Sequence, residues 1–166
     1  MEKLLSHYDI QLSTVIFSDM DNHMDQIILL MNYLENLHLS TYSLFMFAIN
    51  MDKVPHCNLF LYDYKINIWY RIEPNGMILC GEEIYNQYDY VDIHIKKVKT
   101  NYLSQNDYHL LPGLCYINPG YYCMYYAVMM VEEYINNNNM FDVIEKISNI
   151  DYIEKKLKEY KSILKF

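Results

Sequence analysis

Residues 56–76 read HCNLFLYDYKINIWYRIEPNG. The segment contains two apolar runs, 57–63 and 66–73, joined by the short link Tyr64–Lys65 and followed by the turn sequence Pro74-Asn75-Gly76. Alternating apolar positions are typical of a strand with one buried face. The pattern therefore predicts an antiparallel β-hairpin that ends in a sharp turn. On its second strand we expect one face to carry Ile66, Ile68, Tyr70 and Ile72.

The regions around this hairpin predict one further strand and several helices. Residues 24–37 have helical spacing, and residues 43–50 form an apolar run short enough for a buried strand. Residues 121–135 are apolar up to Glu132, which predicts a buried helix that the asparagines after it end. Amphipathic helices are expected at 141–148 and 150–164. Helices and strands are segregated along the chain, so the expected fold class is α+β.

The segment 77–120 gives weaker signals. A short helix is expected at 82–87 and a strand at 90–98. Residues 101–120 contain two turn sequences, Pro112-Gly113 and Asn118-Pro119-Gly120, and are expected to be rich in loops.

Length and composition limit the classes of protein that the chain can belong to. The 166 residues are 52% hydrophobic and 20% charged, which predicts one folded domain over 1–166 and excludes intrinsic disorder. A net charge of −8 disfavours nucleic acid as the main ligand. No apolar run reaches the roughly 18 residues that a membrane-spanning helix needs, and no secretory signal is recognisable. The four cysteines form no CxxC pair, which indicates free thiols in a reducing, intracellular compartment.

Three residues could form a cysteine-hydrolase site. Cys123 follows a turn and opens the apolar helix, where the helix dipole lowers a thiol's pKa, although most free cysteines are simply buried. His56 starts the first hairpin strand and Glu73 ends the second, so antiparallel pairing brings them together. A carboxylate there would orient the imidazole as a general base for the thiol. Asp63, at the far end of the first strand, is the weaker rival carboxylate.

The same residues resemble a known family. The hairpin segment followed by PGYYCMYYAVMMVEEYI is similar to the adenovirus maturation protease and the SUMO-specific proteases, and most of all to protease-like proteins of large cytoplasmic DNA viruses. The spacings 73 − 56 = 17 and 123 − 73 = 50 are similar to those of the adenovirus enzyme. The resemblance extends over about residues 43–135. The matching positions are His56, Asn58, Leu59, Arg71, Glu73, Pro74, Gly76, Tyr122 and Cys123.

The resemblance implies a papain-like α+β fold with an antiparallel-rich central sheet, packed by a buried helix that carries the cysteine. It implies a thiol peptidase, without a cofactor, that acts on peptide or isopeptide bonds of a protein or peptide substrate, often after a small-residue or Gly-Gly motif. Cys123 would be the nucleophile, His56 the base and Glu73 its orienter. The compartment would be the host cytoplasm or the virion if the source is viral. The oligomeric state stays open.

Several positions depart from the family pattern. Relatives have Trp after the histidine and Gly after the nucleophile, where this chain has Cys57 and Met124. They also have a Gln shortly before the cysteine for the oxyanion, and here Asn118 is the nearby amide. Asn58 shares the strand face of the histidine and either shapes a substrate groove or bonds neighbouring backbone.

These departures keep a second hypothesis open: a weak or inactive protease fold that serves as a binding or virion-structural module. No metal site is expected, because the spacings between the cysteines and histidines lack the short paired intervals of structural zinc sites.

Overall fold

The computed structural model describes residues 1–18, 24–51, 54–72, 107–111, 123–138, 140–147 and 149–164. In chain order its elements are α1 (Glu2–Leu5), β1 (Ile10–Ser18), α2 (Met24–Glu35), β2 (Tyr42–Met51), β3 (Val54–Asp63), β4 (Ile68–Ile72), β5 (Asp107–Leu111), α4 (Cys123–Asn137), α5 (Met140–Ile147) and α6 (Ile150–Leu164). The expectations at 82–87 and 90–98 lie outside the described residues.

The five strands form one mixed sheet in the order β1-β2-β3-β4-β5. The strands β2, β3 and β4 pair antiparallel, whereas β1 joins β2 and β5 joins β4 in parallel. The α+β class is confirmed. The expectation of an antiparallel-rich sheet is wrong at the two edges of the described sheet, where both pairings are parallel. Neither edge strand was expected, since parallel partners lie far apart in the sequence and leave no local hairpin signal.

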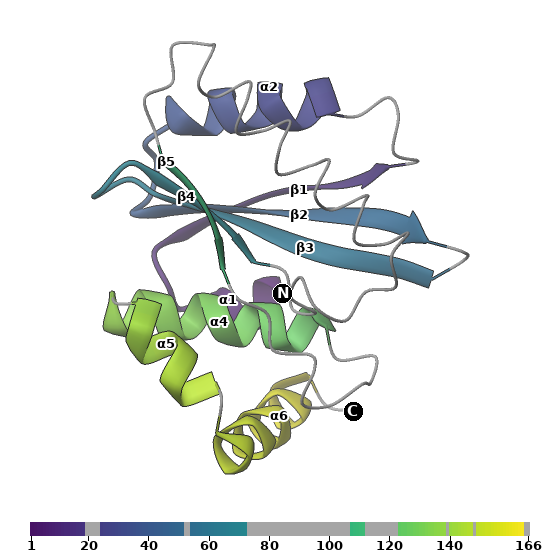
Figure 1. The fold of residues 1–166 in the computed structure, drawn as a ribbon, viewed down its shortest axis with the longest axis vertical. Helices are drawn as coiled ribbons and strands as arrows, with labels where there is room; N and C mark the ends of the chain where they lie inside the picture. The colour runs from purple at the N-terminus through teal and green to yellow at the C-terminus, as the bar shows by residue number, and fades with distance from the viewer. Residues whose placement is uncertain are drawn as a thin grey trace.

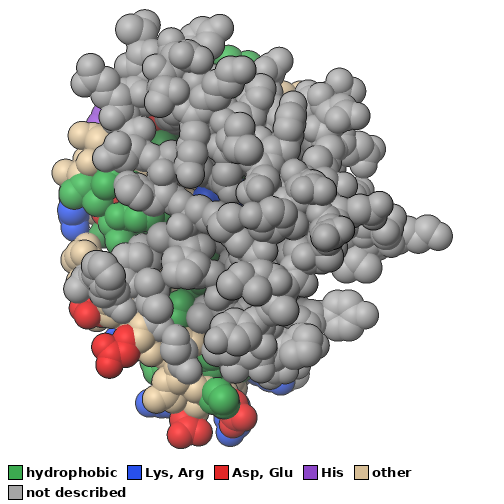
Figure 2. Space-filling view, in the orientation of Figure 1, with side chains coloured by type: hydrophobic (Ala, Val, Ile, Leu, Met, Phe, Trp, Pro, Cys, Tyr) green, Lys and Arg blue, Asp and Glu red, His purple; other side chains and the backbone are tan. Residues whose placement is uncertain are grey.

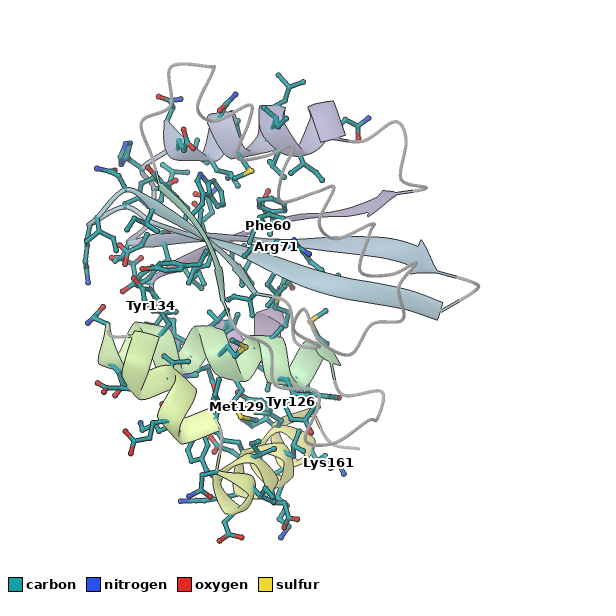
Figure 3. The ribbon with its side chains drawn as sticks, in the orientation of Figure 1. Phe60, Arg71, Tyr126, Met129, Tyr134 and Lys161 are labelled. Atoms are coloured by element: carbon teal, nitrogen blue, oxygen red, sulfur yellow. The ribbon has the colours of Figure 1, made fainter. Side chains whose placement is uncertain are left out.

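The helices cover both faces of the sheet. Figure 1 shows α2 on one face and α1, α4, α5 and α6 on the other. Side chains alternate accordingly along β3: Leu59 and Leu61 belong to the core cluster with α4, whereas Phe60 stacks on Phe45 with ring centroids 4.8 Å apart. Figure 3 places Phe60 on the side of α2. On this side the indole of Trp69 donates a hydrogen bond to Glu35 at the end of α2.

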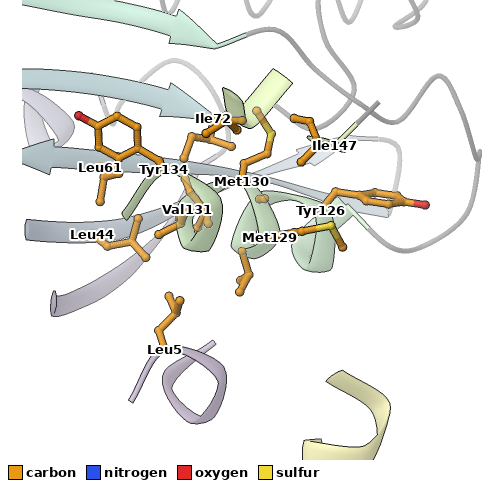
Figure 4. Close-up of a cluster of buried hydrophobic side chains, with 14 of the residues drawn as sticks. Leu5, Leu44, Leu61, Ile72, Tyr126, Met129, Met130, Val131, Tyr134 and Ile147 are labelled. Carbon is orange, nitrogen blue, oxygen red and sulfur yellow. The ribbon is translucent and has the colours of Figure 1, made fainter. Parts of the chain in front are cut away.

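An apolar core cluster lies between the sheet and α4 (Figure 4). From α4 it takes a continuous run of fully buried residues, and from the sheet it takes residues of β2, β3 and β4. This agrees with the predicted buried helix, which begins at Cys123 and continues through Asn137. Asn138 follows in the left-handed region, with φ 52°, so the asparagine run does end the helix. The helices expected at 24–37, 141–148 and 150–164 and the strand at 43–50 are confirmed as α2, α5, α6 and β2.

The predicted hairpin is confirmed, with one correction at its turn. The strands β3 and β4 pair antiparallel from Asp63–Ile68 to Leu59–Ile72. The second strand begins at Ile68 and not at residue 66. Ile66 is half exposed within the turn, so it does not share the buried face of Tyr70. The cause is the turn itself, which needs residues 64–67 and bends back at Asn67 with φ 56°.

Asn67→Ala is expected to lower the free energy of unfolding by about 1–2 kcal/mol, because alanine tolerates the left-handed conformation poorly. The substitution also removes the carbonyl that accepts a hydrogen bond from Tyr62 at 3.2 Å. Urea unfolding measures the change. Asn67→Gly is the matched control, because glycine adopts this conformation freely. An alanine variant as stable as the glycine variant would show that the backbone at Asn67 carries no strain.

Candidate active site

The structure describes the backbone at three of the predicted site residues. His56 and Asn58 lie in β3, opposite Ile49 and Phe47 of β2. Cys123 is the first residue of α4, as the sequence predicted. Glu73 and Asn118 lie outside the described residues.

The register of the hairpin determines where β4 ends relative to the predicted base. Ile72, the last residue of β4, pairs with Leu59, three residues after His56. The C-terminal end of β4 therefore lies at the same end of the sheet as the N-terminal end of β3. The pairing of β2 with β3 is unbroken from Val54 to Asp63, so positions 56 and 58 belong to the same alternating set as Phe60.

The helix α4 runs in the same direction as β3. Near its C-terminal end, the Tyr134 hydroxyl donates a 2.8 Å hydrogen bond to Oδ2 of Asp63, the last residue of β3. Cys123 lies eleven residues before Tyr134, about 16 Å along a helix. His56 lies seven residues before Asp63, about 23 Å along a strand. In Figures 3 and 4, Tyr126 and Tyr134 mark the two ends of α4. The start of α4 therefore lies towards the end of the sheet at which β3 begins.

The position of Cys123 gives a physical reason for thiol reactivity. The first turn of a helix exposes unpaired backbone N–H groups, and the helix dipole favours negative charge there. Both effects lower the pKa of a thiol. The same N–H groups can donate to a carbonyl oxygen that becomes negative during attack. The next residue, Met124, is partly buried against the core cluster.

Two adjacent buried carboxylates hold the other half of α4 in place. Glu132 accepts hydrogen bonds from Tyr160 and from Lys156 of α6, the latter at 3.2 Å. Glu133 accepts from Tyr152 of α6 and, at 2.8 Å, from Lys146 of α5. Both glutamates are 3% exposed. Through these contacts α5 and α6 brace the helix that starts with Cys123.

The protonation states of Glu133, Tyr152 and Tyr160 follow from their burial and from their hydrogen-bond and ion-pair partners. Burial raises the pKa of Glu133, but hydrogen bonds from Lys146 and Tyr152 and the charge of Lys146 outweigh burial, so its pKa is lowered. Burial, together with the hydrogen bond to a carboxylate, raises the pKa of Tyr152 and of Tyr160. Both tyrosines therefore stay protonated donors at neutral pH. This brace was not predicted from the sequence, where its signal is a pair of glutamates in an otherwise apolar segment.

The outer surface of α5 and α6 carries charges of both signs. Figure 2 shows acidic and basic side chains side by side at the lower end of the molecule. Exposed examples from α6 are Glu154, Lys155, Lys158 and Glu159. Mixed charges of this kind are typical of a solvated helix face.

The described part of the chain shows neither a membrane-crossing helix nor a metal site. No helix there is both long and apolar enough to cross a membrane. Within the same ranges, no three His, Cys, Asp or Glu side chains gather as metal ligands would. Asp63 lies at the far end of β3 from His56, as expected, and accepts hydrogen bonds from the Tyr134 hydroxyl and the Lys65 N–H.

Comparison with solved structures finds a likeness to the "SUMO protease Ulp1 with the catalytic cysteine oxidized to a sulfinic acid". The two chains share 11% identity with a TM-score of 0.40, over 92% of this chain and 72% of that one. A TM-score this low does not establish a common fold, so the fold class stands on the elements described above. No protein-family model and no curated protein matches the sequence.

Proposed function

We propose that the chain is a thiol peptidase that hydrolyses peptide or isopeptide bonds of a protein substrate. The observation that carries the proposal is that α4 begins at Cys123 and runs alongside β3 in the same direction. The start of the helix and the start of the strand that contains His56 therefore lie towards the same end of the sheet. A thiol and an imidazole there are the two groups that nucleophilic attack on an amide needs.

In the proposed reaction, His56 takes the proton of the Cys123 thiol, and the thiolate attacks the carbonyl carbon. The S–C bond forms, the C–N bond breaks, and the protonated imidazole gives its proton to the leaving amine. Water then hydrolyses the thioester, with the same imidazole as base. The Cys123 backbone N–H and the side-chain amide of Asn118 would stabilise the oxyanion.

The orienting role of Glu73 rests on the hairpin register. In the antiparallel pairing, each step back along β3 corresponds to one step forward along β4, and the last observed pair is Leu59–Ile72. One further pair would place position 73 opposite Asn58, in the same alternating set as position 56. We propose that Glu73 holds the His56 imidazole there and that Asn58 lines the substrate groove. Because α4 covers the other face of the sheet, the proposal requires the imidazole to reach the thiol around the end of the sheet.

The proposal also implies a compartment. A thiolate nucleophile works only while it stays reduced, so we propose an intracellular, reducing environment.

A second candidate is a protease fold that binds a partner without turnover. One observation favours it: Met124, next to the nucleophile, packs against the core, where the resembling proteases have glycine. Retention of Cys123, His56 and Glu73 together opposes it, because a module without turnover needs none of the three.

Thiol labelling separates the two candidates. We expect Cys123 to react with iodoacetamide at pH 7 at least about tenfold faster than the other cysteines, since the first turn of a helix favours a thiolate. His56→Ala is expected to remove that advantage, whereas His109→Ala, which changes a histidine outside the proposed site, is expected to keep it. Mass spectrometry of each cysteine-containing peptide gives the four rates. If Cys123 labels no faster than Cys57, Cys80 and Cys115 in the wild-type protein, the peptidase proposal is wrong and the binding module is favoured.

A further inference from the structure

One buried hydrogen bond joins the element that contains the proposed base to the element that contains the proposed nucleophile. The Tyr134 hydroxyl of α4 donates to Oδ2 of Asp63, which ends β3, at 2.8 Å. Both residues are 2% exposed. The hydroxyl oxygen of Tyr134 also lies 3.3 Å from that of Tyr70 on β4, and the two rings pack at 4.7 Å. The bond is therefore enclosed between the helix and the hairpin.

Neighbouring residues of α4 make apolar contacts with the sheet. A further polar contact lies at Asn138, directly after α4, whose side-chain oxygen accepts a hydrogen bond from Tyr42 of β2 at 3.0 Å, but Asn138 is exposed, so water can replace that bond. Met130 and Val131 belong to the same cluster as Leu59, Leu61 and Ile72. Apolar burial has no preferred direction, and methionine adapts its shape to its surroundings. Such a surface tolerates a small displacement of the helix along the strand. A buried polar pair does not, because a shift leaves a donor and an acceptor without partners, and in coiled coils a single buried polar residue can fix the register.

We propose that the Tyr134–Asp63 hydrogen bond sets the axial position of α4 on β3 and thereby the separation between Cys123 and His56. The inference rests on the proposed function as far as its effect on reactivity is concerned. Tyr134 is a positioning residue, because it lies about 16 Å of helix away from Cys123. Errors of about 1 Å in the placement of reacting groups can cost about a hundredfold in rate.

The test compares two variants that each remove one buried tyrosine hydroxyl bonded to a carboxylate. Tyr134→Phe breaks the bond from α4 to the hairpin. Tyr160→Phe is the matched control, because its hydroxyl bonds Glu132 between α4 and α6. Both variants are assayed at a temperature at which circular dichroism shows them fully folded. We expect Tyr134→Phe to slow iodoacetamide labelling of Cys123 about tenfold at pH 7 and to move its pH profile upward. Tyr160→Phe is expected to stay within about twofold of the wild type.

A distance measurement tests the axial position independently of any reaction. Spin labels are attached at Cys123 and at Ile66→Cys, an exposed position in the turn next to Asp63, in a chain whose other cysteines are replaced by serine. The distribution of distances between the labels is expected to broaden or shift in Tyr134→Phe and to stay unchanged in Tyr160→Phe. If Tyr134→Phe does not fold, Asp63→Asn replaces it, since the amide keeps the shape and weakens the bond. Distances equal to those of the control variant would overturn the inference, whereas labelling of Cys123 that does not depend on His56 would overturn the proposed function alone.

Discussion

Cys123→Ala is expected to abolish measurable cleavage of a peptide amide that ends in Gly-Gly-aminomethylcoumarin. The loss expected is roughly 10⁴-fold or more, because removing the nucleophile of a catalytic triad leaves only binding and oxyanion stabilisation. The release of aminomethylcoumarin is followed by fluorescence. The peptide is chosen because the resemblance implies cleavage after Gly-Gly.

The controls are the other thiols. Cys80→Ala and Cys115→Ala are expected to keep the wild-type rate, since neither has a role in the proposed reaction. Cleavage that survives in Cys123→Ala would assign the activity to another group or to a contaminant. A wild-type protein that neither cleaves the peptide nor shows the rapid labelling of Cys123 would be a module of the protease fold without turnover.

The second large effect concerns the brace between α4 and the C-terminal helices. Glu133→Ala is expected to lower the free energy of unfolding by about 2 kcal/mol, because it removes the buried carboxylate that accepts a hydrogen bond from Tyr152, whereas its ion-pair partner Lys146 is 46% exposed and stays solvated. The hydroxyl of Tyr152 loses its acceptor, and Lys146 loses a 2.8 Å ion pair. Chemical denaturation at pH 7 measures the loss. Glu145→Ala on the exposed side of α5 is the matched control, expected to change stability by less than about 0.5 kcal/mol.

The same carboxylate predicts a pH dependence. The pKa of Glu133 is lower in the folded chain than in the unfolded chain. Its contribution to stability is therefore fully present above the unfolded pKa, about 4.3, and is lost as the pH falls through the lower folded value. Glu133→Gln removes this titration, so unfolding curves between pH 6 and pH 3 are expected to change less steeply in the variant. Equal pH dependence in both proteins would show that Glu133 is not held ionised by Lys146 and Tyr152.

The centre of the fold could be predicted from the sequence, because it is built from local signals. Alternation within 57–63 and 66–73 and the short link between them predicted the hairpin, and an apolar run followed by asparagines predicted α4. The edge strands could not be predicted in this way. Parallel pairing of Ile10 with Tyr42 and of Ile68 with Asp107 depends on residues far apart in the chain. Ile66 was predicted to lie in the second strand, but it lies in the turn. Alternation of apolar and polar residues could not show this, because the turn interrupts the strand without changing the residue types.

Two backbone positions at the candidate site could be predicted. The sequence predicted that Cys123 would open a helix and that Asp63 would lie at the far end of the strand from His56, and the structure agrees with both. The roles of His56, Glu73, Asn58 and Asn118 stay predictions. The partners of Glu132 and Glu133 could not be predicted, because contacts of a buried carboxylate across three helices depend on packing angles that periodicity does not determine.

The arrangement of strands in the sheet has a consequence for how the molecule folds. Residues 42–72 form its three central strands as a continuous meander, whereas the edge strands come from 10–18 and 107–111. Contacts that are close in sequence cost less chain entropy to close than distant ones. The meander can therefore act as the nucleus of folding, on which both outer strands and the thiol-bearing helix assemble later. A mutation in β3 would then slow folding, and one in β1 would mainly speed unfolding.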